Sequence, residues 1–402
     1  MLTTAVCSPE RKLPVNLTAP ILPVQGSAHH IAFVVNNYLP SVGGVEFHVA
    51  ALANQLARMG ARVTVFCLDN ETPSELDSNP RIVRLKCSPA VGGVLAWPWP
   101  GTSRQIRLML ADGSVTAIST HTRFFPMSLL GVRLARRFGV ASIHTEHGSA
   151  AVKGVSPLVS LASNLVDWTM GRFVLRGASR VLCISDGARE FVRDLAGVDG
   201  EVFHNAIDTG SFTNVASNPS GSDSAIPRHR LVYVGRIVPG KGWELALATA
   251  EQLAADHPEM ELHIVGDGID RAALASRAAA SPWADRVLIH GQQSPAQIAD
   301  LLRGSVFLNP TTLSEGFQTT LLEAVAAGAA VVSTPVGAAR YLLEAGADIR
   351  LAEAADPAAW VDSVRAALGS PVTLPAAALV DSFDWKRRAA EYLAVVNSAR
   401  NS

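Results

Sequence analysis

Short apolar runs alternate with amphipathic helical patterns along almost the whole of this 402-residue chain. The run His30–Asn36 has the composition of a buried strand. After it, apolar residues recur at helical spacing from Val45 to Met59, and Gly60 ends the pattern. Repetition of strand, helix and strand predicts right-handed crossovers and a parallel, doubly wound sheet. We therefore expect an α/β fold.

The alternation is interrupted once, by a segment rich in Ser, Asn, Pro and Gly, and then resumes. A chain of this length also exceeds the usual size of one domain. We expect a loosely ordered extension over 1–28, a first Rossmann-like domain over 29–212, a linker over 213–229 and a second such domain over 230–375. Residues 376–402 should form a helix that crosses back to the first domain, with a cleft between the two domains.

Individual elements can be placed from the same pattern. Further strands of the first series are expected at Arg62–Leu68, Arg81–Leu85, Val115–Ser119, Ala141–His144, Arg180–Ile184 and Glu201–Phe203. Strands of the second series are expected at Leu231–Val234, Glu261–Val265, Val287–His290, Val306–Leu308 and Ala330–Ser333. Helices of the second series are expected at Trp243–Ala255, Ile269–Ala280, Pro295–Leu302, Gly316–Ala327 and Ala338–Glu344.

Composition excludes several classes of function. The formal net charge is −1, so the chain lacks the basic footprint of a nucleic-acid-binding protein. Its 4 cysteines form no C-x-x-C pair, which favours buried free thiols over a metal or disulfide role. No apolar run reaches the ~18 residues of a spanning helix. We expect a soluble, cytoplasmic protein, and arginines such as Arg133, Arg172 and Arg176 leave open a peripheral contact with anionic lipid at the inner membrane face.

A glycine-rich loop carrying two cations opens the second domain. Gly235 and Arg236 follow an expected strand, and Lys241 and Gly242 precede the next helix. Ligands of open α/β sheets bind at the carboxyl ends of the strands. Cations on such a loop, together with the amides of a helix start, can hold a diphosphate. Alone, this motif is equally compatible with two solvated charges on a turn.

The stretch SEGFQTTLLEAVAAG, residues 314–328, carries two acids eight positions apart. Glu315 should lie at a strand exit and Glu323 inside the following helix, among apolar residues where an idle carboxylate is costly. Either carboxylate could accept hydrogen bonds from sugar hydroxyls. Backbone amides at the helix start could hold a phosphate, and they belong to Phe317, Gln318, Thr319 and Thr320.

The first domain offers fewer polar candidates. Gly43 and Gly44 join the first strand to the first helix, where a glycine pair lets the backbone approach a phosphate, although a plain tight turn fits as well. His121 follows an expected strand and should face the cleft. The segment from His144 to His147 contains possible metal ligands, but adjacent positions of an extended chain point to opposite faces, so we expect polar lining and no metal site.

Together these motifs resemble those of the retaining glycosyltransferase family four, of GT-B fold, from about His30 to the carboxyl terminus. The resemblance lies in SVGGVE, the His121 strand exit, FHNAID, YVGRIVPGKG, IVGDG and SEGFQTTLLEAVAAG. One departure lies within the last motif, where Gln318 replaces a frequent glycine and narrows the space expected around the donor sugar.

The resemblance implies a role for each matching residue. Arg236 and Lys241 would bind the donor diphosphate, Glu323 the ribose, and Glu315 the transferred sugar. Gly43 and Gly44 would approach the phosphates, with Gly235 and Gly316 also lining the donor site, and His121 would lie near the transferred sugar. The activity implied is hexosyl transfer from a nucleotide-diphosphate sugar, GDP- or UDP-linked, with no tightly held metal or other cofactor.

The acceptor stays open among lipid-linked sugars, polysaccharide and small molecules. Two other functions remain as alternatives. A nucleotide-dependent oxidoreductase would need a G-x-G-x-x-G fingerprint after the first strand, which SVGGVE does not supply. A non-catalytic nucleotide-sugar binder would have lost some of Arg236, Lys241, Glu315 and Glu323, and all are present.

Overall fold

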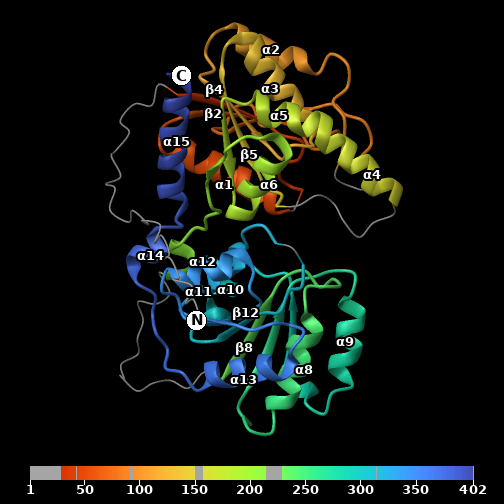
Figure 1. Cartoon of the computed structure of the whole chain (residues 1–402), viewed down its shortest axis with the longest axis vertical. Helices are drawn as coiled ribbons and strands as arrows, with labels where there is room; N and C mark the ends of the chain where they lie inside the picture. Colours follow the sequence, from red (N-terminus) through yellow and green to blue (C-terminus); the bar gives the residue numbers. More distant parts are fainter. Residues whose placement is uncertain are drawn as a thin grey trace, which may run out of the picture.

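The computed structural model describes residues 29–41, 43–90, 95–149, 157–213, 229–313 and 315–401. Two parallel sheets, each covered by helices, form two α/β domains stacked along the long axis of the molecule (Figure 1). The expected extension 1–28, most of the expected linker 213–229 and Ser314 lie outside the described residues.

The first domain is built on a seven-stranded sheet in the order β3-β2-β1-β4-β5-β6-β7, in which all paired strands are parallel. Its strands are β1 (His30–Val34), β2 (Arg62–Leu68), β3 (Arg81–Leu85), β4 (Ala117–His121), β5 (Ala141–Glu146), β6 (Arg180–Cys183) and β7 (Glu201–Val202). Its helices are α1 (Gly44–Arg58), α2 (Ser103–Ala111), α3 (Pro126–Phe138), α4 (Pro157–Val166), the π-helical turn η1 (Asp167–Gly171), α5 (Arg172–Gly177), α6 (Asp186–Ala196) and α7 (Gly210–Thr213).

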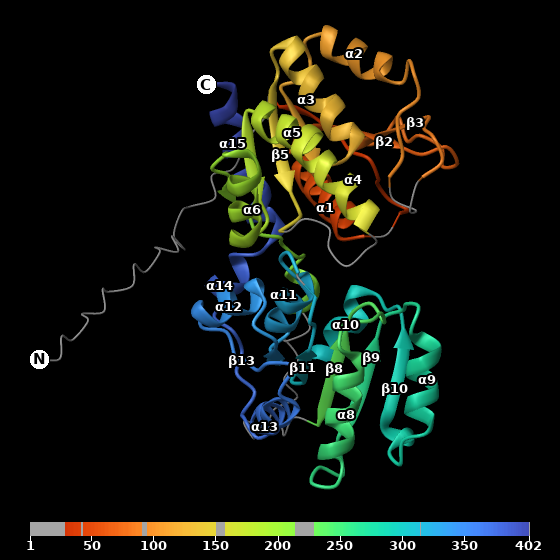
Figure 2. The ribbon, with the colours of Figure 1, turned by 45° about the vertical axis from the view of Figure 1, so that its right-hand side comes forward.

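The second domain is built on a six-stranded sheet in the order β10-β9-β8-β11-β12-β13, also parallel. Its strands are β8 (Arg230–Val234), β9 (Glu261–Val265), β10 (Val287–Gly291), β11 (Val306–Asn309), β12 (Ala330–Ser333) and β13 (Ile349–Leu351). Its helices are α8 (Trp243–Leu253), α9 (Arg271–Ala279), the 3₁₀ turn η3 (Ala284–Arg286), α10 (Pro295–Leu302), α11 (Thr319–Ala326), α12 (Gly337–Glu344), α13 (Pro357–Leu368) and α14 (Ala377–Asp381). Figure 2 shows α8 and α13 beside this sheet.

The last helix, α15 (Trp385–Arg400), lies against the first domain although it follows the second in sequence (Figures 1 and 2). Its buried face, formed by Ala389, Tyr392, Leu393 and Val396, joins the apolar core around β1 and β2. At the crossing, Ile207 N donates to Phe383 O at 2.9 Å, and Trp385 N donates to Ile207 O at 3.2 Å. The chain segments that leave and re-enter the first domain are thus hydrogen-bonded side by side.

Several element boundaries differ from the sequence expectations. The helix expected over Gly316–Ala327 begins only at Thr319, because Gln318 has extended backbone angles and precedes the first helical residue. The elements α2, α13 and β13 were not expected, and the single helix expected over 376–402 is divided into α14 and α15. β13 has only 3 residues, too few for an alternating or helical pattern to stand out.

Candidate functional site

The loop between β8 and α8 holds Arg236 and Lys241 at the carboxyl edge of the second sheet. The Tyr233 hydroxyl lies 3.1 Å from Arg236 O and 3.4 Å from Lys241 O, which folds the loop back over its own strand. Gly242 has φ +83°, and a methyl group there would overlap the carbonyl oxygen of Pro310. Only glycine lets this loop approach the neighbouring one so closely. Arg236 is exposed, and its guanidinium has no hydrogen-bond or ion-pair partner among the described residues.

The neighbouring loop, between β11 and α11, carries Glu315. Lys241 Nζ donates to Glu315 Oε1 at 2.6 Å, and the two side chains are only 14% and 18% exposed. Thr312 N also donates to Gly240 O at 2.8 Å, so the two loops are joined through backbone and side chains. The structure therefore brings together Lys241 and Glu315, which are 74 positions apart in sequence.

The amino terminus of α11 presents uncapped amides. Gln318 occupies the N-cap position but makes no side-chain cap. Its side chain instead pairs with Asn309, accepting from Asn309 Nδ2 at 2.9 Å and donating to Asn309 Oδ1 at 3.3 Å. The first amides of a helix have no partner within the helix, so those of Thr319 and Thr320 remain available to an anion.

Glu323 lies one turn into α11. Its neighbours Leu321, Leu322, Ala324 and Val325 are buried, while Glu323 itself keeps some solvent access. Its carboxylate has no hydrogen-bond partner among the described residues, and burial raises its pKa to about 7. An acid in this state can accept hydrogen bonds from a ligand's hydroxyl groups, which would then supply the partners it lacks.

Across from these loops, His121 is the last residue of β4 and is fully buried. Its ring packs with those of His48, from α1, and His147, which follows β5. His121 Nδ1 lies 3.0 Å from His147 Nε2, and His121 Nε2 lies 3.1 Å from Ser119 Oγ. Burial lowers the pKa of His121 well below its usual value, so the ring is neutral near pH 7.

A buried ion-pair network fixes the strand exits next to His121. Arg123 is 1% exposed and donates to Glu146 Oε1 at 2.9 Å and to both Asp167 oxygens at 2.8 and 2.9 Å. Burial alone would raise the pKa of Glu146, but hydrogen bonding from His144 and the Arg123 charge lower it to about 2. Between His121 and Arg123, Thr122 has φ +64°, uncommon for a residue other than glycine. The amides on either side of this bend are both bonded, Thr122 N to Thr145 O at 3.0 Å and Arg123 N to Glu146 Oε2 at 3.1 Å.

Gly43 and Gly44, also in the first domain, differ in how much space surrounds them. Gly44 has open space around its Cα, as a site for close approach requires. Beside Gly43, however, the Glu46 carboxylate lies so close that a methyl group there would overlap its Oε2. The Glu46 carboxylate therefore occupies the start of α1, where the family resemblance implied approach to the phosphates.

The two domains meet at the β11–α11 loop. Asn205 Nδ2 donates to Phe317 O at 2.7 Å, and the His204 ring stacks on Phe317 with centroids 4.3 Å apart. A methyl group on Gly316 would lie 2.7 Å from Ile184 Cδ1 of the first domain. Glu315, Gly316 and Phe317 also line a cavity of about 250 Å³, together with first-domain residues such as His204 and Asp186.

The structure thus groups Gly235, Lys241, Glu315 and the start of α11 on one side of the domain contact, with His121 on the other. Sequence reasoning missed His48 and Arg123. Arg123 could have been found, since it lies two residues beyond His121 at the same strand exit. His48 gave no comparable indication, because its spacing in α1 is that of a core position.

Both domains match known glycosyltransferase families. Residues 42–211 match the family model described as Glycosyltransferase Family 4, and residues 228–370 match the model described as Glycosyl transferases group 1. Among curated proteins, the chain is 28% identical to a phosphatidyl-myo-inositol mannosyltransferase of Mycolicibacterium smegmatis over 81% of this chain and 80% of the relative. It is 26% identical to one subunit of the phosphatidylinositol N-acetylglucosaminyltransferase of Homo sapiens, over 77% of this chain but only 62% of that protein.

Solved structures share the fold. A sucrose-phosphate synthase from Thermosynechococcus elongatus superposes with a TM-score of 0.71 at 20% identity, over 92% of this chain and 98% of the other. The Anabaena protein HepE, in complex with UDP and glucose, superposes with a TM-score of 0.67 at 16% identity, over 92% of this chain and 100% of the other. Both similarities support the arrangement of two facing Rossmann-like domains.

Proposed function

The chain belongs to glycosyltransferase family 4, of GT-B fold, and on this premise we propose that it moves a hexosyl group from a UDP- or GDP-sugar to a hydroxyl acceptor with retention of anomeric configuration. The second domain binds the donor and the first domain faces the acceptor. The single observation that carries the proposal is the joined pair of loops in which Lys241 and Glu315 meet beside the uncapped start of α11.

The residue types suit a nucleotide-sugar donor. Arg236 and Lys241 supply cations for the diphosphate, and the first amides of α11 supply neutral donors for one of its phosphates. Glu323, one turn further along the same helix, accepts from the ribose hydroxyls, and Glu315 accepts from a hydroxyl of the hexose. HepE, a protein of the same fold, forms a complex with UDP and glucose, which supports this class of donor.

The cations also account for catalysis. Breaking the bond between sugar and phosphate leaves an oxocarbenium-like sugar and a nucleoside diphosphate with one more negative charge. Cations already in place at the diphosphate stabilise that charge as it develops, an effect worth about 3–4 kcal/mol for a single well-placed donor. Among the described residues, no carboxylate contacts His121. We therefore propose that the acceptor hydroxyl attacks from the face of the leaving group and that a phosphate oxygen takes the proton of this hydroxyl.

A screen of common nucleotide sugars tests this proposal. Purified protein is mixed with each UDP- and GDP-sugar, release of the nucleoside diphosphate is followed, and the product's anomeric configuration is read by NMR. We expect turnover of at least one donor with the configuration retained. An inverted product contradicts the retaining mechanism, and the absence of binding and turnover for every donor contradicts the proposal as a whole.

We further propose that the acceptor is carried at an anionic membrane surface. None of the helices in the described part of the chain has the length and apolar character that a membrane crossing requires. An apolar stripe on α4 and η1 is nevertheless exposed, with Leu161, Leu165 and Trp168 at 68%, 62% and 63%. Arg172 and Arg176 continue it at helical spacing. Apolar side chains flanked by arginines are typical of helices that lie in the interface of an anionic membrane.

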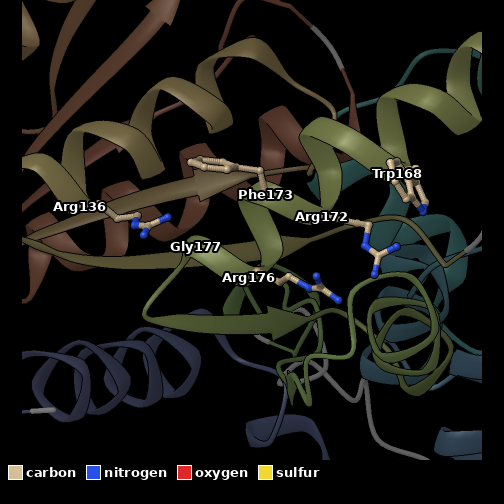
Figure 3. A pocket seen from close by; sticks show the side chains of 6 residues that line it. All are labelled: Arg136, Trp168, Arg172, Phe173, Arg176 and Gly177. Atoms are coloured by element: carbon tan, nitrogen blue, oxygen red, sulfur yellow. The ribbon is translucent and has the colours of Figure 1, made fainter.

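A basic cavity of about 420 Å³ adjoins this stripe (Figure 3). Trp168, Arg172 and Arg176 line it, and the Arg136 and Arg172 guanidinium groups lie near the rings of Phe173 and Trp168 at 5.7 and 5.4 Å. The cavity contains none of the donor-site residues. Its chemistry suits a phosphate group on a lipid head, which agrees with the phosphatidylinositol in the names of the two relatives.

Vesicle sedimentation tests the membrane proposal. We expect the protein to sediment with vesicles that contain anionic lipid, to do so less at high salt, and to lose most binding in Trp168→Ala. Leu374→Ala is the control, because Leu374 is 63% exposed like Trp168 but lies in the second domain, between α13 and α14. Equal binding of both variants, or no preference for anionic lipid, would refute the proposal.

A further inference from the structure

Three histidine side chains from separate elements meet at the carboxyl edge of the first sheet. His48 comes from α1, His121 ends β4 and His147 follows β5. One ring nitrogen of each lies within 4.8 Å of the others. From this juxtaposition we infer that His48, His121 and His147 form a binding site for a transition-metal ion of the zinc class, and that occupancy of the site inhibits the enzyme.

The tautomer of His48 leaves a nitrogen free for a metal. Asn205 Nδ2 donates to Phe317 O, so its Oδ1 faces His48 Nδ1 at 3.0 Å and accepts that ring's proton. His48 Nε2 must then carry a lone pair. It is buried and has no hydrogen-bond partner among the described residues, in a side chain that is 3% exposed. A buried acceptor without a partner is costly, and a metal ion would relieve that cost.

His121 and His147 can each present a lone pair to a metal ion through a change of tautomer alone. His121 Nδ1 and His147 Nε2 are 3.0 Å apart, so one of them now donates to the other. If His121 carries its proton on Nε2, it donates to Ser119 Oγ, 3.1 Å away. If His147 carries its proton on Nδ1, both facing nitrogens hold lone pairs. The protein then loses no proton, and Ser119 and Asn205 orient the ligands as outer partners of metal-bound histidines usually do.

The chemistry of the pocket selects the class of ion. Imidazole binds metal ions in its neutral form. Three imidazoles suit zinc, copper, nickel or cobalt ions, and they are poor ligands for magnesium or calcium. His147 is partly exposed, which gives an ion a way in and leaves a fourth position for water.

Only small movements are needed. Zinc–nitrogen bonds of about 2.0–2.1 Å in a tetrahedral site place the ligand nitrogens about 3.3 Å apart. The His121–His147 pair would open by a few tenths of an ångström from its 3.0 Å separation, and His48 would close from within 4.8 Å. The nearest aromatic neighbours, Trp385 beside His48 and Phe33 beside His121, offer no competing ligand.

Inhibition follows from the position of His121 and rests on the proposed function, which places that residue near the transferred sugar. An ion held by three rings would fix His121 and fill space that the sugar needs. Metal binding itself does not depend on the proposed function, because it is measured without donor. A failure of the metal site can therefore be distinguished from a failure of the proposed function.

Cobalt titration of the full chain tests the site. Protein stripped of metal with a chelator is titrated with Co²⁺, and visible absorption reports a tetrahedral site. Zn²⁺ is then added to displace the cobalt, and bound metal is counted by mass spectrometry. We expect one equivalent, and a loss of at least about 100-fold in affinity for His147→Gln, since removing outer-shell partners alone costs about 10–100-fold. His147 is the most exposed ligand, and circular dichroism checks that the variant folds.

The matched control is His290→Gln. His290 Nε2 lies 2.9 Å from His263 Nδ1 in the second domain, and in the part of the chain that the structure describes no third histidine joins this pair in a metal-type cluster. Affinity should be unchanged in this variant, and His48→Gln should repeat the loss seen for His147→Gln. No stoichiometric binding, or equal binding by His147→Gln and the unaltered protein, would overturn the site. Once a donor is known, Zn²⁺ that stimulates turnover, or leaves it unchanged at saturation, would overturn the inhibition.

Discussion

At the scale of single residues, two side chains of the proposed donor site pair with each other, and a bound donor would have to replace that contact. Lys241 Nζ and Glu315 Oε1 form an ion pair at 2.6 Å. A diphosphate would draw on the same ammonium group, and Glu315 would then be free to accept from a sugar hydroxyl. The sequence shows both residues beside strand exits, but their contact depends on the adjacency of β8 and β11, which the order of elements alone does not fix.

Glu323→Gln should stabilise the protein while weakening donor binding. Burial raises the carboxyl pKa from 4.5 to about 7, so the folded state favours the protonated acid. Its contribution to stability is fully present below about pH 4.5 and is lost as the pH rises through about 7. The amide escapes this loss. We expect the variant's free energy of unfolding without donor to exceed the parent's at pH 8 by on the order of 1 kcal/mol, since Glu323 is partly solvated. The two should be equally stable at pH 4.5, and thermal melts at both pH values check this.

The raised pKa of Glu323 also leads us to expect that donor affinity depends on pH. The ionised carboxylate is the better acceptor for ribose hydroxyls, so affinity measured by calorimetry should rise between about pH 6 and 8 in the parent. It should be lower in Glu323→Gln and nearly flat with pH. A parent whose affinity is constant over this range would show that Glu323 does not contact the donor.

At the scale of elements, the alternation of strands and helices in the sequence predicts well where strands end. It predicts poorly which residues from other elements lie beside those strand ends. The chain's periodicity places β4 and β5 in sequence, and parallel order brings their exits together. It does not show that α1 contributes His48 to the same edge, because that depends on how the helix packs. Nor does it show where α11 begins. Phe317 O accepts from Asn205 and the Gln318 side chain pairs with Asn309, and Gln318 is extended just before the helix.

Arg123→Ala should destabilise the first domain strongly. The guanidinium joins the end of β5 to η1 through Glu146 and Asp167, all three nearly inaccessible to water. Removing it leaves two buried carboxylates without their cation, and breaking a buried ion pair in this way costs about 3–5 kcal/mol. Urea denaturation followed by fluorescence measures the change. Part of the loss should be regained as pH falls through the pKa values of the carboxyl groups.

Arg137→Ala serves as the control for this variant. Arg137 lies on α3 but is exposed and has no ion-pair partner among the described residues. Its substitution should change stability by no more than about 0.5 kcal/mol. If the two variants were equally stable, the network around Arg123 would have no structural role.

At the scale of the whole molecule, the carboxyl-terminal helix makes the first domain depend on residues that follow the second. Tyr392 is fully buried among first-domain residues and lies 5.9 Å from the Phe203 ring. Tyr392→Ala should cost about 3–5 kcal/mol. Hydrogen exchange should show the loss of protection in β1, β2 and β4, while β8, β9 and β11 stay protected.

An exposed residue on the same helix provides the comparison. Asn397→Ala should leave exchange unchanged throughout, since Asn397 faces solvent. Loss of protection spread equally over both sheets in Tyr392→Ala would instead mean that the domains unfold as one unit. In that case the coupling would run through the apolar cluster across the domain contact, which contains Ile184, Ile207, Phe317 and Leu321.

The most direct test of the donor site is the rate of nucleoside diphosphate release in Arg236→Ala, with the donor found by the screen. Arg236 is exposed and its side chain makes no hydrogen bond or ion pair with a described residue, so the variant should fold and melt like the parent. We predict a kcat/KM lower by about 10²–10³-fold. Arg277→Ala, an exposed arginine on α9, should keep the parent's value. An Arg236→Ala enzyme with near-normal turnover would contradict the claim that preorganised cations at the diphosphate carry the reaction.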